Sequence, residues 1–426
     1  MLSFPTLWGV SLFILIFILF STEKVHKTVA SLLGATLMIL TGIISQEEAF
    51  RAVDWNVIFL LIGMMIITGV LKKTGFFQYV AIKAAKITRG DPFRILIMLV
   101  IITAFLSAFL DNVTTVLMMA PASILIAVEL GISPLPYLIA EAIASNIGGT
   151  ATLIGDPPNI MIGSAAGLGF LSFLKNLTPI ITVLLGVFLL LLKFFFGKGM
   201  VVTTERRARI MEFDLSRVIE DPVLLKKTLL ILILVIIGFL LHEPLHLEVA
   251  TIALSGAFLL LLLSGESPYE IFHEVEWTSI FFFVGLFIMV GGLVELGVLR
   301  VISSRLLHIT GGNLPLTSFI LLWASGTICS VFNNIPYVAT VIPIVQEMGT
   351  HLGSQAILPL WWALALGACL GGNGTMVGAA ANVVVSDIAG RSGYRLSFLE
   401  FTKYGVIVTF INLLISTLYL YFLYLR

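Results

Sequence analysis

The chain has 426 residues, of which 59% are hydrophobic and only 11% are charged. An average soluble domain carries about 25% charged residues, so this composition excludes a soluble globular protein and predicts a polytopic membrane protein. The 24 Lys and Arg residues balance the 24 Asp and Glu residues, which excludes a basic surface for nucleic acid, and the two cysteines exclude a disulfide framework or a CxxC metal site.

Apolar runs of about 20 residues predict the membrane helices in chain order. In the first part of the chain these runs cover residues 5–20, 26–44 and 55–71, and a basic loop follows over residues 72–94. The first run has no basic segment before it and no small-residue cleavage site after it. We therefore expect it to be a membrane helix and not a removable signal.

Two interrupted segments follow. The apolar run 95–128 is too long for one span and has polar residues at its centre, which predicts a re-entrant hairpin with its turn at residues 111–115. The next helix, 137–166, should break, because it contains Gly148, Gly149 and Gly155 and then the Pro157-Pro158 pair. Irregular backbone at membrane depth is tolerated only where protein or a water-filled cavity satisfies it. A fifth helix is expected over residues 179–196.

The second part of the chain repeats the first. Asn333-Asn334 stands where Asp111-Asn112 stood, and the glycine pair, Asn159 and the hairpin proline all recur at nearly constant spacing. The repeats are residues 1–196 and 228–426, joined by a polar connector over 197–227, and the second contains a hairpin at 314–349 and a broken helix at 356–389. Five spans are an odd number, so the second repeat should enter the membrane upside down. The expected fold is an all-α inverted repeat with 10 transmembrane helices and two hairpins.

The basic residues predict the orientation. One face of this topology carries residues 24–27, 72–94, 198–227 and 391–403, and it collects 18 of the 24 Lys and Arg. Basic loops are retained in the cytoplasm. The sequence therefore predicts a plasma-membrane protein with a cytoplasmic central connector and both termini extracytoplasmic.

The four interruptions bring helix ends into the bilayer, where they expose unpaired N–H and C=O groups. The polar side chains at these interruptions form a predicted substrate site of amides and hydroxyls, although each could instead cap its own broken helix. The predicted substrate-binding residues are Asn112, Thr114, Thr115, Thr150, Thr152, Asn159, Asn333, Asn334, Asn373, Thr375 and Asn382.

Asp111 and Asp156 are the predicted proton- or cation-coupling residues. A carboxylate at this depth costs at least a few kcal/mol, and Asn333 and Ala379 occupy the matching positions of the second repeat. The alternative is that Asp156 caps the helix starting at Pro157 and that Asp111 serves only the turn. Two further carboxyl groups, Glu141 and Glu295, are expected at the membrane surface. Cys329 and Cys369 are expected to pack, without forming a metal site.

Four motifs carry a family resemblance: FLSAFLDNVTT, NIGGTATLIGDPPN, FNNIPY and WWALALGACLGGNGT. They resemble the arsenite permease/Na⁺/H⁺ antiporter (ArsB/NhaD) branch of the ion transporter superfamily, and within it P-protein-like members. The resemblance covers nearly the whole chain. It implies a scaffold domain and a mobile transport domain that moves like an elevator, the mobile part being the hairpins, the broken helices and the helix after each.

The expected function is secondary active transport and not enzymatic catalysis. Neutral amides and hydroxyls suit an uncharged polyhydroxylated solute, which favours proton-driven efflux of arsenite or antimonite as the trihydroxide. Sodium–proton antiport and anion or dicarboxylate transport are the alternatives. The LIGD segment lacks the first glycine of the GxGD pattern of intramembrane proteases, whereas a passive channel remains an alternative that only uphill flux would exclude. The expected partners are a small inorganic solute, protons or sodium, and the bilayer. No cofactor is expected, and a homodimer or an ATPase partner is compatible with the sequence.

Overall fold

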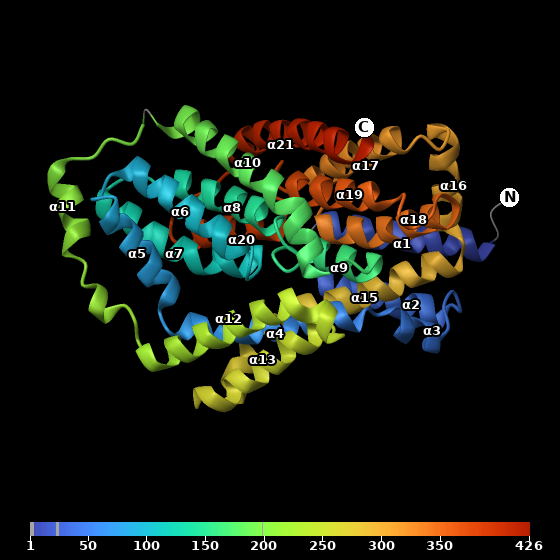
Figure 1. The fold of residues 1–426 in the computed structure, drawn as a ribbon, viewed down its shortest axis with the longest axis horizontal. Coiled ribbons are helices and arrows are strands. Elements are labelled where there is room, and N and C mark those ends of the chain that lie inside the picture. Colours follow the sequence, from blue (N-terminus) through green and yellow to red (C-terminus); the bar gives the residue numbers. More distant parts are fainter. Residues whose placement is uncertain (1–3, 23–24, 198) are drawn as a thin grey trace.

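The computed structural model describes residues 4–22, 25–197 and 199–426, and every regular element in these ranges is helical (Figure 1). The helices before the central connector are α1 (Phe4–Thr22), α2 (Lys27–Leu40), α3 (Gln46–Ala52), α4 (Trp55–Lys73), α5 (Phe76–Ile87), α6 (Pro92–Ser107), α7 (Asn112–Leu130), α8 (Leu135–Gly149), α9 (Pro157–Ala166) and α10 (Phe170–Phe196).

The connector contains α11 (Thr204–Glu212) and a 3₁₀ turn (Leu215–Arg217). The later helices are α12 (Pro222–Leu245), α13 (Val249–Ser264), α14 (Pro268–His273), α15 (Trp277–Glu295), α16 (Val298–Thr310), α17 (Leu314–Val331), α18 (Asn334–Leu352), α19 (Leu358–Gly371), α20 (Ala380–Arg391) and α21 (Phe398–Leu420), which ends in a π-helical turn (Tyr421–Leu425).

Seven helices of the described residues are long and apolar enough to cross a membrane, and five shorter helices, of 10–17 residues, are also apolar. The expected all-helical polytopic class is therefore confirmed. The element order also repeats: α4 begins at Trp55 and α15 at Trp277, and α7 begins at Asn112 and α18 at Asn334. Each helix from α2 to α10 has a counterpart in the same order from α13 to α21.

The helices form two packed groups. One group contains α1–α4, α12, α13 and α15, in which α4 packs on α13 and α2 on α15. The other contains α6–α10 and α17–α21, and it lies above α4, α12 and α13 in Figure 1. Both interrupted hairpins and both broken helices belong to this second group. The short helices α5 and α16 link the groups, since each follows a helix of the first group and packs on a hairpin helix of the second.

Several predicted boundaries were wrong. The loop expected over 72–94 contains α5, whose buried face includes Phe77, Ala81 and Ala85 while Lys83 is exposed. This amphipathic pattern carries too much charge to register as an apolar run. The fifth helix begins at Phe170 and contains Pro179, which had been expected to start it. The first hairpin turn lies at 108–111, one turn earlier than expected, so residues 112–115 form the first turn of α7.

The connector packs against the first repeat at the end of the molecule that holds α11, here named the basic end (left in Figure 1). Arg206 Nη1 donates to Leu130 O (3.1 Å) at the end of α7, and Arg207 pairs with Asp91 (3.4 Å) at the start of α6. Ile210 is fully buried. The contacts show that α11 rests on the open end of the first hairpin.

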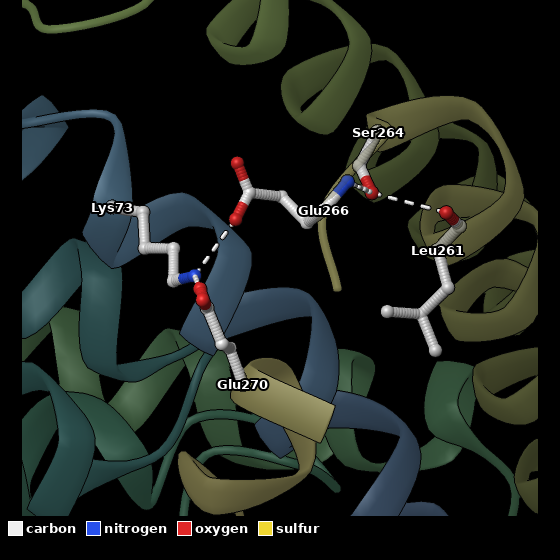
Figure 2. Close-up of polar contacts among 5 residues, drawn as sticks. All are labelled: Lys73, Leu261, Ser264, Glu266 and Glu270. Atoms are coloured by element: carbon white, nitrogen blue, oxygen red, sulfur yellow. Dashed lines mark hydrogen bonds and ion pairs between the residues drawn. The ribbon is translucent and has the colours of Figure 1, made fainter. Parts of the chain in front are cut away.

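An ion-pair cluster joins α4 to the connection between α13 and α15, which contains α14 and is here named the 264–277 loop, at this end (Figure 2). Lys73 Nζ contacts Glu266 (2.7 Å) and Glu270 (2.6 Å), and Lys72 pairs with Glu274 (2.7 Å). The Ser264 hydroxyl donates to Leu261 O (3.0 Å) and accepts from Glu266 N (3.1 Å), which fixes the loop. The hydrogen bond from Lys73 holds the pKa of Glu270 below its ordinary value.

Candidate functional site

The two hairpin turns are built in the same way. Asp111 Oδ1 accepts a hydrogen bond from Thr114 N (2.8 Å), and Asn333 Oδ1 accepts one from Ile335 N (3.1 Å). Each side chain thereby caps the helix that returns from the turn. A threonine of the adjacent broken helix then binds the end of the helix that enters the turn. Thr152 donates to Ala108 O, and Thr375 donates to Ser330 O (2.5 Å).

Glycines allow the broken helices to lie directly against the hairpins. A Cβ atom on Gly148 would lie 2.0 Å from Ala104 O, and one on Gly371 would lie 2.6 Å from Gly326 O. Any larger residue would push the two helices apart. The glycines that recur in both repeats therefore set the distance between hairpin and broken helix.

Asn146 is the hub of the buried polar cluster. Its Nδ2 donates to Asn373 Oδ1 (2.9 Å) and Asn382 Oδ1 (3.0 Å), and its Oδ1 accepts from Asn112 Nδ2 (3.0 Å). One amide thus connects the first hairpin, the end of α8 and both parts of the second broken helix. All four side chains are buried.

A second contact crosses between the repeats at the corresponding position. Cys369, which takes the place of Asn146 in the second repeat, lies 3.5 Å from Asn159 Oδ1 with its thiol as donor. Asn159 Nδ2 in turn donates to Thr150 O (3.1 Å) and Thr152 O (2.9 Å), and Asn382 Nδ2 donates to Gly372 O (2.8 Å) and Thr375 O (3.0 Å). The amides of the two broken helices therefore stabilise their own unwound segments and meet the opposite repeat.

Several buried polar atoms of this cluster lack a hydrogen-bond partner among the described residues. They are Asn112 Oδ1, Thr115 Oγ1, Asp156 Oδ2, Asn334 Nδ2 and Asn373 Nδ2. Each such group costs about 1–3 kcal/mol when nothing binds it. The first repeat supplies two acceptor oxygens and a hydroxyl, and the second supplies two amide donors. The buried residues of the described chain include no Lys, Arg or His. The arrangement can bind a small solute that both donates and accepts hydrogen bonds.

The two predicted coupling carboxylates differ in geometry. Asp111 is half-buried and caps α7, so its side chain also serves the turn. Asp156 is buried, but its side chain makes no cap to α9; only its backbone C=O accepts from Asn159 N (2.9 Å). The alternative that Asp156 is a capping residue is therefore wrong for the side chain, which instead lies within hydrogen-bonding reach of Cys369 and Asn112.

The other predicted residues divide into two kinds. Thr150 donates to Asn146 O (2.7 Å) within its own helix end, and Thr152 and Thr375 hold the hairpins. Each of these hydroxyl groups already donates its hydrogen bond to a backbone carbonyl oxygen. The remaining predicted residues reach the cluster or the hairpin tips: Asn112, Thr114, Thr115, Asn159, Asn333, Asn334, Asn373 and Asn382.

Sequence reasoning missed two residues of the site, and it also misplaced Glu141, which lies outside the Asn146 cluster. Asn146 stands at the head of the NIGGT motif, and its polarity inside an apolar helix was the signal that could have identified it. Cys369, expected to pack, is the counterpart of that asparagine. Glu141, expected at the surface, is fully buried, because α8 begins at Leu135 and places Glu141 nearly two turns into the protein.

Three cavities lie between the helix groups: one, of about 480 Å³, is lined by α3, α15 and α18 away from the hairpin tips, and the two others adjoin the broken helices. Of these two, one, of about 450 Å³, reaches the second hairpin tip at Asn333 and is also lined by His26, Phe282 and Asp387. The other, of about 500 Å³, is lined by His242 and Glu248 on one side and by Leu153, Ile160 and Ser164 on the other. Asp111 does not line this cavity. Of the three cavities, only the one at Asn333 therefore leads to a hairpin tip in this conformation.

Interrupted hairpins, broken helices and a buried polar cluster inside a polytopic helical protein define a membrane transporter. The sequence matches the citrate transporter family (CitMHS) over residues 17–367, and the chain belongs to that family. It is 44% identical over 421 residues to a protein of Mycobacterium bovis named an uncharacterized transporter, covering 98% of each chain.

The human P protein is a further relative, 34% identical over 482 residues that cover 93% of this chain and 57% of the P protein. The crystal structure of the Alcanivorax borkumensis YdaH transporter has the same fold, with a TM-score of 0.58 at 14% identity and coverage of 98% of this chain and 97% of that one. The resemblance to P-protein-like members that the motifs predicted is confirmed by the human sequence.

Proposed function

We propose that this protein is a proton-coupled secondary transporter that exports a small uncharged polyhydroxylated solute of the arsenous or antimonous acid type, as in the ArsB/NhaD branch. The observation that carries the proposal is the set of unpaired buried amide and hydroxyl atoms beside two carboxyl groups, with no buried cationic side chain in the part of the chain that the structure describes. A trihydroxide donates and accepts hydrogen bonds without bringing charge into the bilayer. An anion would be repelled by the Asp111 and Asp156 carboxylates.

Coupling follows from what a carboxyl group does when it binds a proton. As a carboxylate, Asp111 or Asp156 accepts hydrogen bonds from the O–H groups of the solute. When protonated, the same group becomes a donor and gives up that role. Proton binding from the extracytoplasmic side would therefore release the solute there, and proton loss to the cytoplasm would restore binding.

The movement is proposed to be an elevator within an inverted repeat. The group α6–α10 and α17–α21 would travel as the transport domain against the group containing α4, α13 and α15. With the basic end in the cytoplasm of a plasma-membrane protein and the termini outside, the cavity at Asn333 opens inward. This conformation would then be the inward-facing state.

A second candidate substrate is a carboxylate anion such as citrate, which the family description favours. Because the buried residues supply no cationic side chain, the anion would have to arrive with a bound cation. Sodium–proton antiport is the third candidate, in which carboxylate and carbonyl oxygens bind the ion.

The deciding experiment is flux in proteoliposomes containing the full chain, with a preset proton gradient and either arsenite, citrate with Mg²⁺, or sodium. Uphill arsenite movement supports the proposal, and uphill movement of another solute replaces it. Asp111→Asn should abolish gradient-driven transport without lowering expression, since the variant resembles Asn333 but cannot titrate. Wild-type transport by that variant would remove Asp111 from coupling, and downhill flux alone would identify a channel.

A further inference from the structure

Glu141 is a fully buried carboxyl group in the half of α8 that lies nearer the basic end. Its Oε1 accepts a hydrogen bond from Ser123 Oγ at 2.5 Å, and its buried Oε2 has no partner among the described residues. A carboxylate with one unpaired oxygen is expensive to bury, whereas proton binding at Oε2 neutralises it. The geometry therefore calls for a proton on this group for at least part of the time.

Polar side chains continue from Glu141 in both directions along α8. Tyr137, Glu141 and Ser145 recur every four residues and so lie along one helix face. Tyr137 Oη donates to Pro92 O (2.8 Å) near the basic end, and Ser145 O accepts from Ser107 Oγ (2.7 Å) beside the hub residue Asn146. Glu141 lies about 7.5 Å along the helix axis from Asn146, at 1.5 Å per residue.

The second repeat has nothing comparable. Leu360, Leu364 and Ala368 occupy the positions of Tyr137, Glu141 and Ser145, and Val345 occupies that of Ser123. α19 nevertheless forms and packs on α17 as α8 packs on α6. The module thus folds with an apolar stripe, so the polar version in the first repeat is unnecessary for architecture.

No charged side chain compensates Glu141 from the helices packed on α8, as far as the described residues extend. Those helices are α6, α7, α10, α19 and α20. The charged residues within them are Arg94, Glu129, Lys175, Lys193, Asp387 and Arg391, none of them buried, and the cysteine among them, Cys369, is engaged with Asn159. The nearest titratable neighbour is Tyr137 on the same helix, and beyond it lies the Asp91–Arg207 pair.

We propose that Glu141, with Ser123 as its hydrogen-bond donor, is a third proton-binding site, which passes protons between the basic end and the carboxyl groups of the Asn146 cluster. Oε2 takes up the proton and releases it again, and Oε1 remains the acceptor for Ser123. This role rests on the proposed proton coupling but not on which solute is carried.

The first test needs no solute. Infrared spectra of the full chain in lipid vesicles, recorded over a pH titration, should contain the C=O stretch of a protonated carboxylic acid that Glu141→Gln removes. Glu141→Asp should keep a shifted band. The control Glu295→Gln changes an exposed acidic residue and should leave the band unaltered. A spectrum of Glu141→Gln identical to that of the wild type would overturn the proposal.

The second test separates proton transfer from structure. With arsenite at equal concentrations on both sides and no gradient, Glu141→Gln and Ser123→Val should exchange radiolabelled solute at wild-type rates. Gradient-driven accumulation should fall at least tenfold in Glu141→Gln. Unimpaired accumulation, or an equal loss of exchange and accumulation in both Glu141→Gln and Glu141→Asp, would overturn the role. If even the wild type moves no arsenite but the infrared band titrates, the proposed solute fails while the proton site stands.

Discussion

The Asn146 hub makes a strong prediction about stability. Asn146→Ala leaves Asn112 Nδ2, Asn373 Oδ1 and Asn382 Oδ1 without their partner in a buried site. At about 1–3 kcal/mol for each unsatisfied group, the free energy of unfolding should fall by at least about 3 kcal/mol, unless water enters and lowers the loss. No other side chain in the described residues joins the first hairpin to both parts of the second broken helix.

Cys369→Ala provides the matched control, because Cys369 occupies the same position in the second repeat. It removes one weak S–H group, which lies 3.5 Å from Asn159 Oδ1 and also faces Asp156, so the loss should be about 1 kcal/mol and smaller than that of Asn146→Ala. Thermal unfolding of both variants in detergent, followed by tryptophan fluorescence, gives the order directly. If Asn146→Ala unfolds at the wild-type temperature, or if Cys369→Ala is the less stable of the two, the hub has been misassigned.

Three further perturbations test separate parts of the structure. Asn112→Ala and Asn334→Ala should each weaken solute binding by about 1–3 kcal/mol, measured by isotope-displacement titration, and unchanged affinity in both would remove the amides from the site. Gly148→Ala should prevent a stable monodisperse protein on size exclusion, since its Cβ would overlap Ala104 O, whereas Gly186→Ala, which meets no atom within 4 Å, should behave as wild type. Because the pKa of Glu270 is lowered, its ion pair with Lys73 stabilises the loop at neutral pH and is lost as the pH falls through that lowered value. Limited proteolysis of the 264–277 loop should therefore increase in acid, and Glu270→Gln should show the increase already at pH 7.

The repeat and the interrupted segments could be predicted because they depend on residues with strong local effects. Glycine pairs, Pro157-Pro158 and the Asn333-Asn334 turn recur at fixed spacing, and an apolar run of 34 residues cannot form one span. Each of these signals acts within a few residues of the chain. The corresponding helix ends therefore appear in the structure close to where they were expected.

Amphipathic helices and single buried side chains could not be predicted in the same way. α5 and α16 are short and carry Lys83 or Arg300 and Arg305, so a hydropathy window assigns them to loops. The burial of Glu141 depends on which residue begins α8, and an error of one turn moves a side chain from the interior to the surface. Polarity along the chain also cannot tell an aspartate that caps a helix, such as Asp111, from one that does not, such as Asp156.

The pattern of satisfied and unsatisfied groups separates scaffold from site within one cluster. The Thr152 and Thr375 hydroxyls donate to the hairpin backbone, and the Asn159 and Asn382 amides donate to the unwound segments, at corresponding positions in both repeats. A transporter that satisfied every buried polar atom in this way would have no free hydrogen-bonding atom for a solute. The atoms without partners on Asn112, Thr115, Asn334 and Asn373 instead leave the empty state less stable by about 1–3 kcal/mol each. The proposed solute, hydrogen-bonded to both hairpins, would remove this cost only while the two repeats stay together around it.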